Sequence, residues 1–256
     1  MRFLLIPVSV AAVALVLSVL FHPAHGFWTV ATTATAVLAI AAMIGAASCF
    51  RASDFMRWAW SLSAVPYLTA SLSIVSTAVF APGGPSALTL ALSITGNLMA
   101  VPGAALFVLA YRRAGFGFGG LRTNAVLIYA GGLTLALLLG GSVVSASVHG
   151  LLAASQPLQP VLDLISTASD LGCFLLALPL LRIAVALRGG RLSFTWALLA
   201  GTNLSWLVAN VAFEAANANA AAAVAYRVIF VSANAAGAAA ALSHRAAVAA
   251  VHRLVR

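Results

Sequence analysis

Apolar residues fall into eight long runs along the chain, separated by short stretches that are polar or rich in glycine and proline. Each run is close to the roughly 20 residues that an α-helix needs to cross a bilayer. The predicted spans are 3–21, 27–50, 58–80, 86–111, 123–148, 158–187, 192–213 and 220–243. We therefore expect an all-α, polytopic membrane helix bundle, with one eight-helix domain over residues 1–243 and a short basic cytoplasmic tail over 244–256.

The composition agrees with this pattern. Hydrophobic residues make up 63% of the 256 positions and charged residues only 7%, and the mean hydropathy is +1.10. A soluble domain has about 45–50% apolar and about 25% charged residues. We therefore expect an integral membrane protein in direct contact with the lipid bilayer.

The arginines indicate the orientation of the helices. All 13 basic residues are arginine, and every one except Arg227 falls at the amino terminus, at the carboxyl terminus or near one of the breaks around residues 54, 117 and 189. With the amino terminus inside, these segments all lie on the cytoplasmic side, where positive charge near helix ends is retained. Abundant alanine without lysine also suggests a GC-rich bacterial source. We expect a multi-pass protein of the bacterial plasma (inner) membrane with both termini cytoplasmic.

The first apolar run has a second interpretation. Arg2, the apolar run and the small residues Ala24 and Gly26 resemble a secretory signal peptide cleaved after Gly26. The run is longer than the usual 7–15-residue apolar region of such peptides, which favours an uncleaved helix.

A faint internal repeat links the two halves of the chain. Arg51 followed by Trp60 corresponds to Arg188 followed by Trp196. This spacing maps helices one to four onto helices five to eight in the same orientation, a 4+4 parallel repeat of a kind that occurs in transporters.

Polar residues that a bilayer disfavours gather in the last three predicted spans. A charged side chain near the bilayer centre costs roughly 2.5–3.5 kcal/mol on insertion scales and usually faces a bundle interior. Asp163 and Asp170 are seven residues apart and share a helix face, and Asp170 and Arg227 lie at similar depth, which predicts that they pair. The predicted ligand or ion pathway comprises Asp163, Asp170, Asn203, Asn210, Glu214, Tyr226, Arg227 and Asn234.

A purely structural interpretation stands beside this one. Asparagine, serine and threonine hydrogen-bond across membrane helices simply to hold them together, at about 0.6 kcal/mol each on average. The glycine pairs Gly131-Gly132 and Gly140-Gly141 predict surfaces where helices pack closely.

Several chemistries find no support in the residues. A retinal Schiff base needs a lysine, which the chain lacks, and intramembrane aspartyl catalysis needs carboxyls on two helices, whereas Asp163 and Asp170 share one. We expect no enzyme activity, no catalytic residues, no cofactor and no metal. A weak metal or pH-responsive cluster of His22, His25 and His149 stays open as an alternative.

We expect a sensory or regulatory membrane module with an outward-facing polar pocket. The alternative is a small-solute or ion transporter or channel that uses a buried Asp/Arg pair. Because the arginines are spread over separate segments, no nucleic-acid partner is expected. Two further partners are possible on this interpretation: a cytoplasmic protein bound at the basic tail, and a second copy of the chain in a homo-oligomer.

Overall fold

The structure, a computed structural model, describes residues 2–21, 25–80, 86–115, 122–153, 158–187, 190–216 and 219–254. Over these ranges every regular element is an α-helix, so the predicted all-α fold is confirmed. The helices are α1 (Arg2–Phe21), α2 (His25–Ala47), α3 (Phe55–Phe80), α4 (Ala87–Arg113), α5 (Arg122–Ala153), α6 (Leu158–Ala186), α7 (Arg191–Ala216) and α8 (Ala220–Leu254).

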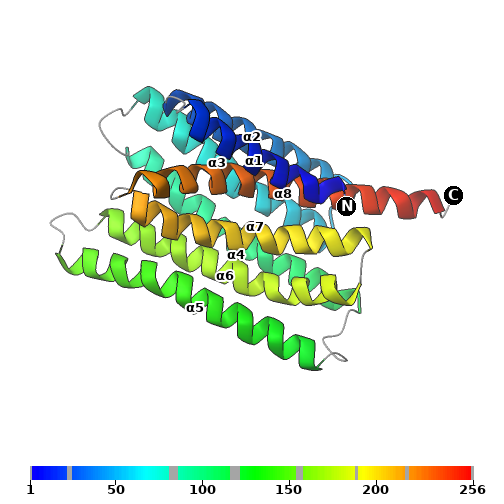
Figure 1. The fold of residues 1–256 in the computed structure, drawn as a ribbon. Coiled ribbons are helices and arrows are strands. Elements are labelled where there is room, and N and C mark those ends of the chain that lie inside the picture. The colour runs from blue at the N-terminus through cyan, green and yellow to red at the C-terminus, as the bar shows by residue number, and fades with distance from the viewer. Residues whose placement is uncertain are drawn as a thin grey trace.

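Successive helices run up and down through one bundle, and the two termini lie at the same end of it (Figure 1). This end also contains the described links between α2 and α3 and at the start of α7, with Arg51, Arg57 and Arg191. We call it the basic end, and the opposite end the distal end. The helical state follows from the solvent, because a lipid-embedded backbone must satisfy its hydrogen bonds within its own segment.

Within the described ranges, six helices are long and apolar enough to cross a membrane: α2, α4, α5, α6, α7 and α8. In α1 the described apolar stretch, Phe3–Val19, is shorter. Large apolar side chains also face outward, for example Val8 on α1 and Leu127 and Leu138 on α5, each more than 60% exposed. These helices indicate a multi-pass protein in contact with the bilayer, while the count of eight spans and the 4+4 repeat stay predictions.

Six of the helices form a closed ring. Each packs against the next in the order α2, α3, α4, α6, α7, α8, and α8 returns to α2. The other two lie outside this ring: α5 packs mainly on α6, and α1 packs mainly on α8 (Figure 1). The interior of the ring is therefore the place where side chains from distant parts of the sequence meet.

A cluster of rings fills the interior near the basic end. Trp60 on α3, Phe107 and Tyr111 on α4, Trp196 on α7 and His244 on α8 are all at most 4% exposed. Trp60 and Phe107 meet edge to face with ring centroids 4.8 Å apart, and Tyr111 and Trp196 meet edge to face at 4.6 Å. We call these five residues the aromatic plug.

His244 fixes one corner of the aromatic plug. The indole Nε1 of Trp60 donates to Nδ1 of His244 at 2.7 Å. Because an indole N–H can only donate, Nδ1 must be the unprotonated imidazole nitrogen. His244 is the first residue of the tail expected from the sequence, but α8 continues without a break to Leu254, so the helix runs straight through this boundary.

Only half of the glycines expected at close contacts are found there. A side chain at Gly132 would meet Leu178, and one at Gly140 would meet Leu171, whereas Gly131 has nothing within 4 Å and neither has Gly141. The expectation is therefore correct for one glycine of each pair and wrong for its neighbour. Consecutive helical residues point about 100° apart, so one faces α6 while the next faces outward.

We predict that the same substitution destabilises the protein at Gly132 and does not at Gly131. Gly132→Leu places a side chain against Leu178, itself buried with Ala136, Phe174 and Leu207, and should lower the free energy of unfolding by about 1–3 kcal/mol through overpacking. Gly131→Leu should leave it unchanged or raise it slightly. Thermal unfolding in detergent compares the two, and equal losses would show that α5 does not pack as described.

Candidate functional site

The ring of helices encloses a cavity of about 420 Å³. Its lining comes mainly from α3, α4, α6, α7 and α8. Toward the distal end it reaches Thr89 and the exposed residue Glu214, and toward the basic end it reaches Phe107 and Leu180. Because Phe107 belongs to the aromatic plug, the cavity is closed on the side that carries the arginines.

Six of the eight predicted site residues line this cavity. They are Asp163, Asp170, Asn203, Asn210, Glu214 and Tyr226. Asp163 and Asp170 lie on one face of α6, as their spacing predicts, and the three α7 residues lie on the facing helix. The two polar stripes therefore do meet across α6 and α7, which pack directly against each other.

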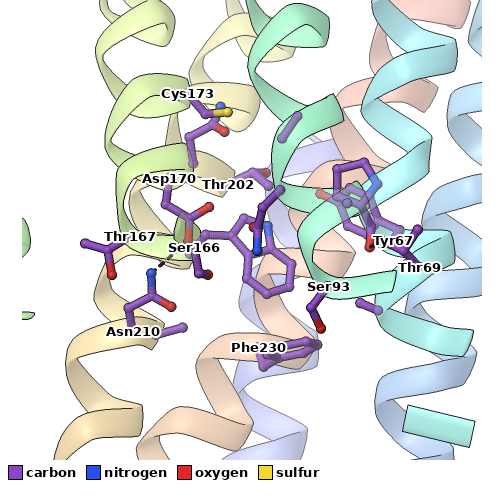
Figure 2. A pocket seen from close by; sticks show the side chains of 18 of the residues that line it. Tyr67, Thr69, Ser93, Ser166, Thr167, Asp170, Cys173, Thr202, Asn210 and Phe230 are labelled. Carbon is purple, nitrogen blue, oxygen red and sulfur yellow. Dashed lines mark hydrogen bonds between the residues drawn. The ribbon is translucent and has the colours of Figure 1, made fainter. Parts of the chain in front are cut away.

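Asp170 and Asn210 form the polar contact between these two stripes. Nδ2 of Asn210 donates to the Asp170 carboxylate at 2.8 Å, and Figure 2 shows the two side chains joined between neighbouring helices, with Tyr67 and Ser93 on other helices across the cavity. A second contact ties α6 to α4, since the Ser169 hydroxyl donates to the carbonyl of Asn97 at 2.6 Å.

The charged side chains that line the cavity are all acidic. Its lining contains three of the four acidic residues of the chain, Asp163, Asp170 and Glu214, and, among the described residues, no arginine or histidine. The cavity also contains the buried hydroxyl of Thr167, which has no hydrogen-bond partner within the described part of the chain. The site is thus rich in acceptors and negative charge.

A row of five contacting aromatic side chains forms one wall of the cavity. Phe213 contacts Tyr226, Tyr226 contacts Phe230, Phe230 contacts Trp206, and Trp206 contacts Tyr67, with centroid separations between 4.5 and 6.1 Å. All five residues line the cavity. Acidic groups and ring faces therefore occur together in one enclosed space.

The predicted pairing of Asp170 with Arg227 is wrong. Arg227 does not line the cavity; its guanidinium lies over the ring of Trp28 on α2, 6.0 Å from the centroid. The reason is angular. Tyr226 faces the cavity, and the next residue of the helix points about 100° away, toward α2.

Asn234 is also separate from the cavity. Its side chain is 1% exposed and lies between α8 and α2, where Nδ2 donates to the carbonyl of Thr32 at 3.3 Å and to the hydroxyl of Thr35 at 3.2 Å. This contact joins helices, as the structural interpretation of the asparagines expected. Asn203 combines both roles, because it lines the cavity while its amide donates to Leu199 of its own helix.

The histidine alternative gains no support from the residues that the structure describes. His149 lies at the distal end and its Nδ1 is 2.7 Å from the carbonyl of Ser145. No group of three or more possible metal-binding side chains is found in the described ranges. His22 and the side chain of His25 lie outside them.

Trp206 is the main cavity residue that the sequence analysis missed. It lies three residues after Asn203 and four before Asn210, so helical spacing places it on the same face as these two asparagines. This spacing could have identified Trp206 from the sequence.

Comparison with protein-family models, with curated proteins and with solved structures finds no match. The proposed function therefore rests on the site itself.

We predict that Asp170 and Asn210 are energetically coupled. In a double-mutant cycle with Asp170→Leu and Asn210→Leu, the coupling energy should be about 0.5–2 kcal/mol, since removing one partner leaves the other unpaired in a low-dielectric interior. Unfolding in mixed micelles supplies the measurement.

Asn203→Leu is the matched control for this cycle, because its amide bonds to its own helix. It should show little coupling to Asp170→Leu. A coupling energy at Asn210 no larger than that at Asn203 would contradict the assignment of the Asp170 contact.

Proposed function

We propose that the protein is a sensory or regulatory module of the bacterial plasma membrane that binds a small organic cation in the cavity. The observation that carries this proposal is the composition of the lining, which has three carboxyl groups, six aromatic side chains and, among the described residues, no basic side chain. The proposed role is binding rather than catalysis.

The chemistry of the lining suits a protonated or quaternary amine. Ring faces attract cations by about 0.5–2 kcal/mol, more when the cation is desolvated. A carboxylate held in place by Asn210 supplies a counter-charge at Asp170. A small anion would instead face three carboxyl groups with no nearby compensating charge, so the site selects against it.

Helix α8 offers a route from the cavity to the basic end. It carries Tyr226 and Phe230 in the cavity wall and His244 in the aromatic plug, and it continues past the neighbouring helices toward the terminus (Figure 1). A ligand that shifts Phe230 therefore acts on the same helix that presents Arg245 and Arg253, both exposed, to a cytoplasmic partner.

We expect saturable binding of a small organic cation to the detergent-solubilised protein. Equilibrium dialysis with tetramethylammonium, choline and ethanolammonium should identify at least one that binds, while the carbon analogue of choline, which lacks the charge, should bind at least about tenfold more weakly. Asp170→Asn should weaken cation binding about tenfold or more, a change of roughly 1.4 kcal/mol.

Asp54→Asn is the control, because this acid lies at the basic end, where its carboxylate accepts from the backbone N–H of Arg51. It should leave the affinity unchanged. The absence of binding by all three cations, or equal effects of the two substitutions, would contradict the proposal.

Transport of such a solute is the second candidate, and the ring of helices favours it. The contacts of α2 with α3 and of α3 with α4 correspond to those of α6 with α7 and of α7 with α8, and the contact of α2 with α8 corresponds to that of α6 with α4. Trp60 and Trp196, the matched residues of the predicted repeat, both lie in the aromatic plug with 0% exposure. Paired halves of this kind support alternating access.

Two assays on proteoliposomes separate the candidates. A transporter should accumulate the labelled cation, and accumulation should stop with Asp170→Asn. A sensory module should bind without accumulation, and the cation should change the distance between spin labels on the basic-end segment of α8 and on α7.

A further inference from the structure

Arg227 is a cation within the apolar helix α8, and its guanidinium faces α2 rather than the acidic cavity. Its contact in the structure is the Trp28 ring, and no carboxylate among the described residues pairs with it. It lies about two turns from the start of α8, and Trp28 about one turn from the start of α2, both counted from the distal end. A long arginine side chain at this level reaches the headgroup region.

An apolar groove begins beside this cation. It has a volume of about 260 Å³ and lies between α1, α2 and α8. Trp28 and Val231 line it, and Val231 is one helical turn from Arg227. Apart from Ser9, every side chain of the lining is apolar.

The groove runs parallel to the axis of α1 rather than across it. Its α1 lining, Ser9, Val10, Val13, Ala14 and Leu17, forms one stripe of a helix face. From Leu17 near the distal end to Ser9 this stripe extends about 12 Å along the helix axis. A narrow apolar channel parallel to the helices, with a cation at its outer end, matches a phospholipid in shape and in charge.

We propose that Arg227 and this groove bind one anionic phospholipid, with the phosphate at the guanidinium and an acyl chain between α1 and α2. A planar guanidinium can donate two parallel hydrogen bonds to phosphate oxygens. The Trp28 indole, buried at 4% exposure, packs beneath both the guanidinium and the chain. This lipid site is independent of the cation-binding cavity on the other side of α8, which Arg227 does not line.

The full chain reconstituted in phosphatidylcholine vesicles tests the lipid site. Brominated acyl chains quench nearby indoles, so the emission that depends on Trp28 is obtained by subtracting the signal of Trp28→Phe. Brominated phosphatidylglycerol should quench this component about threefold to fivefold more effectively per mole than brominated phosphatidylcholine. In Arg227→Gln the two lipids should quench equally, and Arg227→Lys should retain part of the preference.

A second variant keeps the cation and removes the space. Ala14→Phe should lower quenching by both lipids, because the aromatic side chain occupies the groove. Free inorganic phosphate should not relieve quenching, since the acyl chain is part of the ligand.

Equal quenching by the two lipids in the wild-type protein would overturn the proposal. So would a preference that survives Arg227→Gln, or a Trp28 signal that no brominated lipid reaches, as expected when a second copy of the chain covers the groove.

Discussion

A carboxyl group within a membrane helix needs a hydrogen-bonding partner, and Asp170 has one in Asn210 of the neighbouring helix. This contact joins α6 to α7 on the side of the polar stripes, which both helices turn toward the interior of the ring. Packing the same two helices with these stripes toward lipid would leave Asp163, Asp170 and Asn210 in hydrocarbon. The cavity is the arrangement that keeps these groups among polar neighbours.

The aromatic plug gives this cavity its direction. Trp60, Phe107 and Trp196 fill the interior on the arginine side, and the cavity extends from them toward the exposed residue Glu214 at the distal end. Trp196 is fully buried and packs edge to face against Tyr111 and Phe107, whereas the Trp60 indole donates a hydrogen bond to His244. The hydrogen bond of Trp60 therefore joins α3 to α8, the helix that extends beyond the bundle at the basic end.

Much of the fold was predictable because length and hydropathy alone identify membrane helices. Heptad spacing correctly placed Asp163 with Asp170 and Asn203 with Asn210. Pairing across helices was not predictable in the same way, since depth along a helix says nothing about rotation around its axis. Arg227 and Tyr226 share a depth and face different neighbours, and the same rotation separates Gly131 from Gly132.

His244 illustrates a second kind of contact that the sequence pattern could not predict. Its position after the last apolar run made it look like the start of a tail, but its partner Trp60 is 184 residues away in sequence. Only the closure of the ring from α8 back to α2 and α3 brings them together. Contacts that depend on ring closure lie beyond periodicity arguments, which concern single helices.

Water access to the cavity from the distal side is the central claim, and cysteine reactivity measures it directly. In a chain with Cys49 and Cys173 replaced, Ser166→Cys places a thiol in the cavity lining, and Ala168→Cys places one on the exposed, lipid-facing side of the same helix. A membrane-impermeant, positively charged thiol reagent added to intact cells should modify the first and spare the second. An unreactive cysteine at position 166, or one that reacts only from the cytoplasmic side, would contradict the account.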